Sequence, residues 1–135
     1  MENYYRLITL LSMKYSLWFP THCVEAGSFR GWLDKFFAQP AYRLDNERQA
    51  IVARAIRELC LDRGWRLLEI QPNEWDVVVV VESDHQPERI VHDFKIAASR
   101  ALASLDGDGP SRKRFDRRAR ILPLDTPNQA SAASA

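Results

Sequence analysis

A run of five valines, residues 77–81, constrains the fold of this chain more than any other feature of its sequence. β-Branched side chains favour an extended backbone, and the run is far shorter than the about 20 apolar residues that a membrane-spanning helix needs. Because these valines do not alternate with polar residues, we expect residues 74–82 to form a central strand with both faces covered. The run therefore predicts a buried strand within a larger sheet.

Two helices are predicted from the spacing of apolar residues on either side of this strand. Asp45 is a suitable N-cap for a first helix that ends at Gly64. Pro87 suits the first turn of a second helix, which Gly107 closes. The first predicted strand is residues 5–11, which residues 14–19 either continue or follow as a second strand, and the later strands are residues 65–71, 74–82 and 121–124. The order is therefore strand, helix, strand, strand, helix, strand, which is typical of an α+β fold with helices on one face of an antiparallel sheet.

The length of the chain, 135 residues, suits one hydrophobic core, and we predict a single domain over residues 1–124. Within it, residues 20–42 are predicted to form an irregular loop with a short helix at residues 31–37. Residues 107–120 are predicted to be a basic linker segment. The small, polar residues 125–135 predict a disordered tail.

The basic residues are distributed unevenly along the chain. The net charge is only +1, but 15 of the 19 basic residues are arginine, whose planar guanidinium suits phosphate groups. Residues 112–120, RKRFDRRAR, hold six basic side chains and one acid, Asp116. Such a patch predicts a contact with nucleic acid, and a solvated basic arm is the alternative.

The cysteines and the apolar stretches indicate a cytoplasmic protein. Cys23 and Cys60 follow no metal-binding or redox spacing, so we expect two free thiols. The first residues lack the basic region and the small-residue cleavage site of a secretory signal, and no apolar stretch is long enough to span a membrane. We therefore predict no association with a membrane.

Two acidic residues, Glu74 and Asp76, lie two positions apart, and in a strand both carboxylates would project from the same face. Such a pair can hold Mg²⁺ or Mn²⁺, and two solvated carboxylates at the start of a strand are the alternative. His22, His85 and His92 are expected to be polar surface residues rather than ligands. Since the sequence identifies no third ligand, we predict no cofactor and keep a Mg²⁺ or Mn²⁺ site as the alternative.

The stretch QPNEWDVVVVV, residues 71–81, resembles the HUH motif of the single-tyrosine HUH transposases, the IS200-like group that includes the REP-associated tyrosine transposases. That family has Pro-Asn-His-apolar-His before an apolar strand. Residues 44–70 resemble the family's first helix and the strand after it, and residues 87–102 resemble its second helix. The resemblance extends over residues 5–124. It implies an HUH-transposase-like, ferredoxin-like antiparallel sheet with two main helices on one face, in a homodimer.

The departures from the family's motif predict that its covalent chemistry is missing. In the family, the two histidines bind a divalent metal and a tyrosine near the C-terminus attacks the scissile phosphate. Here Glu74 and Asp76 stand at the histidine positions, and all four tyrosines precede the motif. We therefore expect a degenerate, catalytically inactive member of the family rather than an enzyme.

The favoured function is that of an inactive transposase-like accessory factor that binds structured or single-stranded DNA or RNA. The candidate phosphate contacts are Lys95, Arg100, Arg112, Lys113, Arg114, Arg117, Arg118 and Arg120. Trp18, Phe29 and Trp32 are candidates for base stacking, and a place in the core is the alternative. Two other functions stay open: a protein-interaction subunit of a mobile-element or defence assembly, and a metal-dependent nuclease that uses Glu74 and Asp76.

Overall fold

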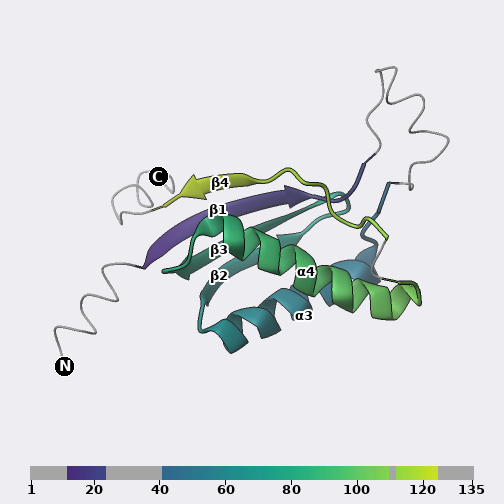
Figure 1. Cartoon of the computed structure of the whole chain (residues 1–135), viewed down its shortest axis with the longest axis horizontal. Coiled ribbons are helices and arrows are strands. Elements are labelled where there is room, and N and C mark those ends of the chain that lie inside the picture. Colours follow the sequence, from purple (N-terminus) through teal and green to yellow (C-terminus); the bar gives the residue numbers. More distant parts are fainter. Residues whose placement is uncertain (1–11, 24–40, 110–111, 125–135) are drawn as a thin grey trace, which may run out of the picture.

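The computed structural model describes residues 12–23, 41–109 and 112–124 (Figure 1). The elements within these residues are β1 (Met13–Pro20), α3 (Asn46–Arg63), β2 (Arg66–Pro72), β3 (Asp76–Ser83), α4 (Pro87–Asp106) and β4 (Arg120–Pro123). Their order confirms the predicted succession of strands and helices. The strand expected at residues 5–11 and the short helix expected at residues 31–37 lie outside the described residues.

The four strands form one antiparallel sheet in the order β2-β3-β1-β4. This is the strand order of a ferredoxin-like α+β fold, in which the two halves of the chain interleave at the centre of the sheet. At one edge β2 has a register shift between Leu67 and Glu69, and at the other edge β4 ends at Pro123, which has no N–H group. Both irregularities make an edge strand a poor template for further pairing.

Local capping residues set the ends of the two helices, as predicted. The side chain of Asp45 accepts a hydrogen bond from the backbone N–H of Arg48 at 2.9 Å, and Gly64 ends α3 with a φ of 72°. Pro87 occupies the first turn of α4, and Gly107 ends it with a φ of 70°. Neither helix in the described residues has the length and apolarity that a membrane crossing requires.

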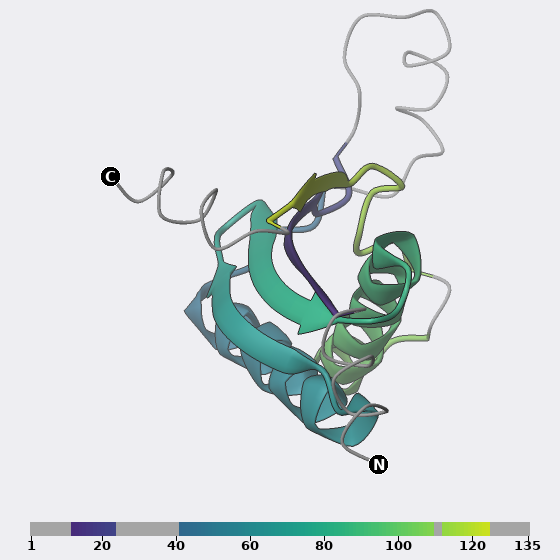
Figure 2. The ribbon, with the colours of Figure 1, turned by 90° about the vertical axis from the view of Figure 1, so that its left-hand side faces the viewer.

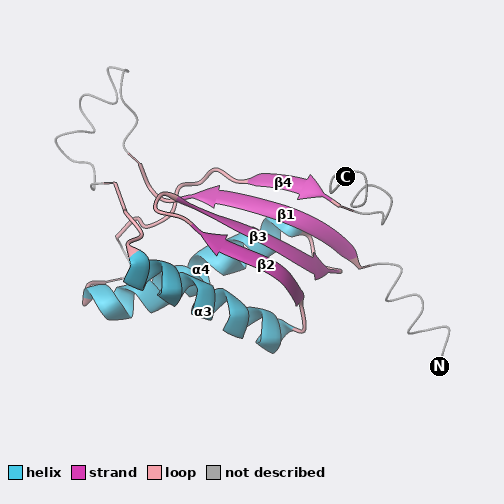
Figure 3. Ribbon diagram, turned by 180° about the vertical axis from the view of Figure 1, so that it is seen from behind, coloured by secondary structure: helices cyan, strands magenta, loops and turns pink. Residues whose placement is uncertain are grey.

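Both helices pack against the same face of the sheet (Figures 2 and 3). The residues that β1 and β3 turn toward them are fully buried: Leu17, Phe19, Val77, Val79 and Val81. The intervening Val78 and Val80 are partly exposed on the opposite face, which we call the open face. The expectation that both faces of the valine strand are covered is therefore wrong, because α3 and α4 cover one face and no other described helix or strand covers the second.

Candidate nucleic-acid interface

The stretch that resembles the HUH motif, residues 71–81, passes the end of the sheet where β1 ends and β3 begins. The backbone N–H and the hydroxyl of Thr21 donate to the carbonyl oxygen of Trp75, at 2.9 and 3.2 Å. The N–H of Leu44 donates to the carbonyl oxygen of Glu74 at 2.8 Å. Thr21 also forms an antiparallel bridge with Phe115, which belongs to the basic segment, residues 112–120. This end of the sheet, which we call the motif end, therefore brings the motif next to the basic segment.

The two acidic residues of the motif both have partners within the fold. Glu74 precedes β3 and forms an ion pair with Arg43. Asp76 begins β3, and its two carboxylate oxygens accept hydrogen bonds from the indole N–H of Trp18 at 3.0 Å and from the amide of Asn73 at 2.7 Å. The expectation that both carboxylates lie in the strand is wrong for Glu74, because the turn before β3 includes it.

The two carboxylates of the motif are held by separate partners. Mg²⁺ and Mn²⁺ need several oxygen ligands, whereas Asp76 is bound to Trp18 and Asn73 and Glu74 is paired with Arg43. In residues 12–23, 41–109 and 112–124, no three His, Cys, Asp or Glu side chains gather into a possible metal site. The nuclease alternative thus has no ligand set in the described part of the chain.

His85 and Cys60 lie away from the motif end of the sheet. The Nδ1 atom of His85 accepts a hydrogen bond from the indole N–H of Trp65 at 3.2 Å, beside the start of α4. Cys23 and Cys60 are both free thiols, as predicted. Burial raises the pKa of the Cys60 thiol to about 11, so this sulfur is an unreactive part of the core.

A buried carboxylate at the end of α4, Asp106, anchors the start of the basic segment. Its side chain is 3% exposed and accepts hydrogen bonds from the hydroxyl of Tyr42 at 2.6 Å, from Arg48 at 2.8 Å and from Arg114 at 3.2 Å. Burial alone would raise the pKa of Asp106, but the hydrogen bonds from these three partners hold it below its usual value. The same bond to Asp106 raises the pKa of Arg48. The cluster is therefore ionised and links three separate segments of the chain.

Arg114 belongs to the interior rather than to the surface. Its side chain is fully buried and forms ion pairs with Asp106 and Asp108. The prediction that Arg114 contacts phosphate is therefore wrong, because a buried guanidinium that two carboxylates hold is not accessible to a ligand. Arg112 is partly engaged as well: it donates to Asp108 at 3.0 Å and lies 4.9 Å from the ring centre of Tyr42.

Lys95, on α4, holds the middle of the basic segment. Its ammonium group donates to the backbone carbonyl oxygens of Asp116 at 2.7 Å and of Arg118 at 3.1 Å. Burial lowers the pKa of Lys95, although the charge of Asp116 acts in the opposite direction. Lys95 was predicted as a phosphate contact, but its hydrogen bonds indicate that it positions the segment that carries the exposed cations.

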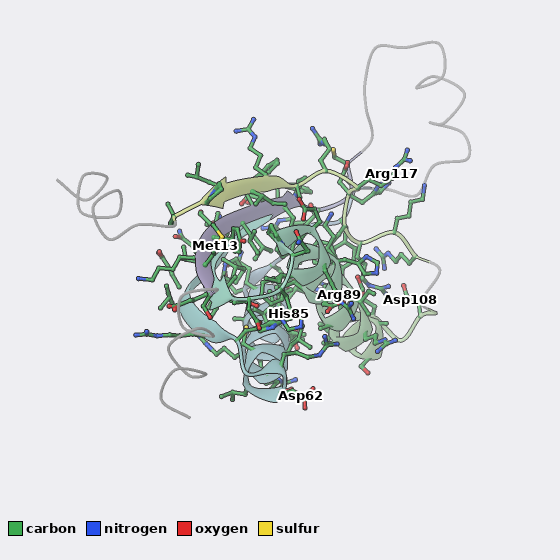
Figure 4. The ribbon with its side chains drawn as sticks, turned by 60° about the vertical axis from the view of Figure 1, so that its left-hand side comes forward. Met13, Asp62, His85, Arg89, Asp108 and Arg117 are labelled. Carbon is green, nitrogen blue, oxygen red and sulfur yellow. The ribbon has the colours of Figure 1, made fainter. Side chains whose placement is uncertain are left out.

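Five predicted phosphate contacts are exposed. They are Arg100, Lys113, Arg117, Arg118 and Arg120. Arg117 lies on the outer side of the segment that joins α4 to β4 (Figure 4). The guanidinium of Arg120 lies 5.3 Å from the ring centre of Trp18, which is partly exposed on the open face rather than in the core. Phe29 and Trp32 lie outside the described residues.

Sequence reasoning missed the residues that hold this site together, above all Tyr42, Arg43 and Asp106. In the sequence, Asp106 is the last residue before the helix-ending Gly107, a position where a polar residue is ordinary. Arg43 and Tyr42 come after a long irregular stretch, where no periodicity signals their partners. The two acids at positions 106 and 108, shortly before the arginines at positions 112 and 114, were the available signal that some of these arginines are paired.

The fold and the site define an α+β protein with a transposase-like fold. A solved structure of a candidate transposase from Deinococcus radiodurans shares this fold, with a TM-score of 0.59 and 15% identity, over 91% of this chain and 87% of that chain. At this identity the similarity shows the fold alone. No family model and no curated protein matches the sequence. The predicted fold class is thereby confirmed, whereas the finer likeness to the HUH group depends on the motif residues.

Proposed function

We propose that this chain is a transposase-related protein that binds structured or single-stranded nucleic acid as an accessory factor and does not cut it. The observation that carries the proposal is the attachment of the basic segment to the motif end of the sheet. Asp106 holds its start and Lys95 holds its middle. Exposed cations on a segment that is already ordered bind phosphates at a lower entropic cost than a free arm would.

The expectation that the protein does not cleave strands is supported by the engagement of the motif residues. Asp76 and Glu74 are bound to Trp18 and Arg43 rather than grouped around a common point. Of the tyrosines in the described residues, Tyr42 is 2% exposed and donates to Asp106, and Tyr15 is 8% exposed. A nucleophile has to reach the phosphorus atom, and neither buried hydroxyl is placed to do so.

The proposal is tested by fluorescence anisotropy with labelled hairpin and single-stranded DNA and RNA over a series of salt concentrations. We expect binding that weakens steeply with salt, because phosphate contacts release counterions. Arg117→Ala and Arg120→Ala each remove one cation, so each should reduce the slope of log K against log[salt] by about 0.9 for a duplex and about 0.7 for a single strand. Arg54→Ala and Arg57→Ala, on the exposed side of α3, are matched controls that should leave the slope unchanged.

The same samples, incubated with Mg²⁺ or Mn²⁺ and run on a denaturing gel, decide between binding and cleavage. Metal-dependent cleavage that Glu74→Ala abolishes would overturn the proposal in favour of the nuclease. Absence of binding at low salt would overturn it in favour of a protein-interaction subunit. The homodimer that the resemblance implies stays a prediction, which sedimentation analysis of the purified protein tests.

A further inference from the structure

One large aromatic side chain, Trp75, stands exposed in the turn between β2 and β3. It is 48% exposed. Tryptophan is highly buried on average, because its side chain removes a large apolar area from water. An indole that is half in water at the motif end of the sheet is therefore a candidate contact surface.

The backbone that carries Trp75 is held on both sides. Its carbonyl oxygen accepts two hydrogen bonds from Thr21, and the carbonyl oxygen of the preceding Glu74 accepts one from Leu44. The N–H of Asn73 donates to the carbonyl oxygen of Asp76 at 2.7 Å, which closes the turn. The indole thus projects from an ordered base, so a ligand that stacks on it does not have to order the turn first.

The surroundings of Trp75 suit an anionic ligand. Thr21 lies between Trp75 and Phe115 and pairs with both, so the two backbones are two strand spacings apart, roughly 10 Å. Phe115 is part of the basic segment, and Arg117 is two residues further on. Arg43 compensates the charge of Glu74, the acid next to Trp75. A strand of nucleic acid can therefore reach the indole and the exposed cations within a few nucleotides.

We propose that Trp75 stacks on an unpaired base of a single-stranded segment whose phosphates contact the basic segment. The inference rests on the nucleic-acid binding proposed above and specifies which part of the ligand this site takes. A base inside a duplex has both faces covered by its neighbours, whereas an unpaired base offers a free face to an aromatic ring. The part of the ligand that Trp75 contacts is thus single-stranded.

The test compares a blunt hairpin with the same hairpin carrying a single-stranded extension, by fluorescence anisotropy at one salt concentration. For the unmodified protein we expect the extension to increase affinity. Trp75→Ala should weaken binding of the extended hairpin by at least about fivefold and leave binding of the blunt hairpin unchanged. Trp75→Phe, which keeps an aromatic face, should retain most of the gain.

A matched control is Leu61→Ala. Leu61 is 83% exposed near the end of α3, about 24 Å along the helix axis from Asp45 at the motif end. The substitution therefore removes exposed apolar surface far from the proposed contact, and it should change the affinity for neither the blunt nor the extended hairpin. Thermal melting of each variant tests whether the fold is intact. We expect an unchanged melting temperature because both positions are exposed.

Four outcomes would overturn the inference. If the unmodified protein binds both hairpins equally, or if Trp75→Ala weakens both by the same factor, Trp75 does not contact the extension, although nucleic-acid binding itself stands. If Trp75→Ala changes only the sedimentation coefficient, a second copy of the chain covers the indole instead. If neither hairpin binds, the proposed function fails together with the inference.

Discussion

Replacing Asp106 by asparagine tests whether the buried carboxylate holds the basic segment on the fold. The side chain is 3% exposed and accepts hydrogen bonds from Tyr42, Arg48 and Arg114. Asparagine keeps the size of the side chain and one carbonyl oxygen but removes the negative charge. Arg114, which is fully buried, then keeps the pairing with Asp108.

The size of the effect follows from burial. Removing one partner of a buried ion pair costs about 3–5 kcal/mol, because the other charge stays in the interior. Asp108 is 34% exposed and offsets part of the loss, so we expect a decrease of about 3 kcal/mol in the free energy of unfolding. Glu74→Gln, in the exposed pair with Arg43, is the matched control and should cost less than about 1 kcal/mol.

Urea unfolding followed by tryptophan fluorescence measures both variants. The midpoint should fall for Asp106→Asn while the slope with urea stays constant, since the same surface is exposed on unfolding. Adding Arg114→Met removes the uncompensated charge, so the double variant should cost less than the sum of the two single variants. A cost below about 1 kcal/mol for Asp106→Asn, or strict additivity in the double variant, would refute the buried ion pair as the anchor.

Three further predictions concern pH and local structure. The pKa of Asp106 is lower in the folded protein than the about 3.9 of a free aspartate, so its contribution to stability is present above about pH 4 and is lost as the pH falls through the folded value. Urea midpoints between pH 5 and pH 2 should therefore fall less for Asp106→Asn than for the unmodified protein. Gly64→Ala should cost about 1 kcal/mol in a urea titration, since Gly64 ends α3 at a φ of 72°, and an unchanged midpoint would contradict this. In a Cys23→Ala variant, Cys60 should react with a disulfide reagent at pH 8 only as the protein unfolds, because burial raises its pKa to about 11; fast reaction of the folded protein would show that the thiol is accessible.

The elements of the fold could be predicted from the sequence because their signals are local. Asp45 caps the backbone three residues away, and Gly64 and Gly107 take a positive φ that other residues adopt at a cost. The order of strands and helices along the chain then allows few topologies for a single sheet. Local signals do not show which faces of the sheet the helices cover. The valine run was therefore expected to be buried on both faces.

The candidate site depended on contacts between distant segments, which no local pattern records. The six basic residues within residues 112–120 give the same sequence pattern whether their side chains face water or pair with an acid. Only the tertiary structure decided that Arg114 is buried against Asp106, and that Lys95 binds carbonyl groups 21 and 23 residues further along the chain.

The sequence by itself determined the helices, the strands, their order and the basic character of residues 112–120, because capping, apolar spacing and charge act within a few residues. Only the tertiary structure decided what surrounds the motif. It brought Glu74 to Arg43 and Asp76 to Trp18, and it placed the exposed Trp75 two strand spacings from the basic segment. These placements arise from the pairing of β1 with β3 and with residues 112–120, and the free energy of that pairing comes from burying surfaces far apart in the sequence.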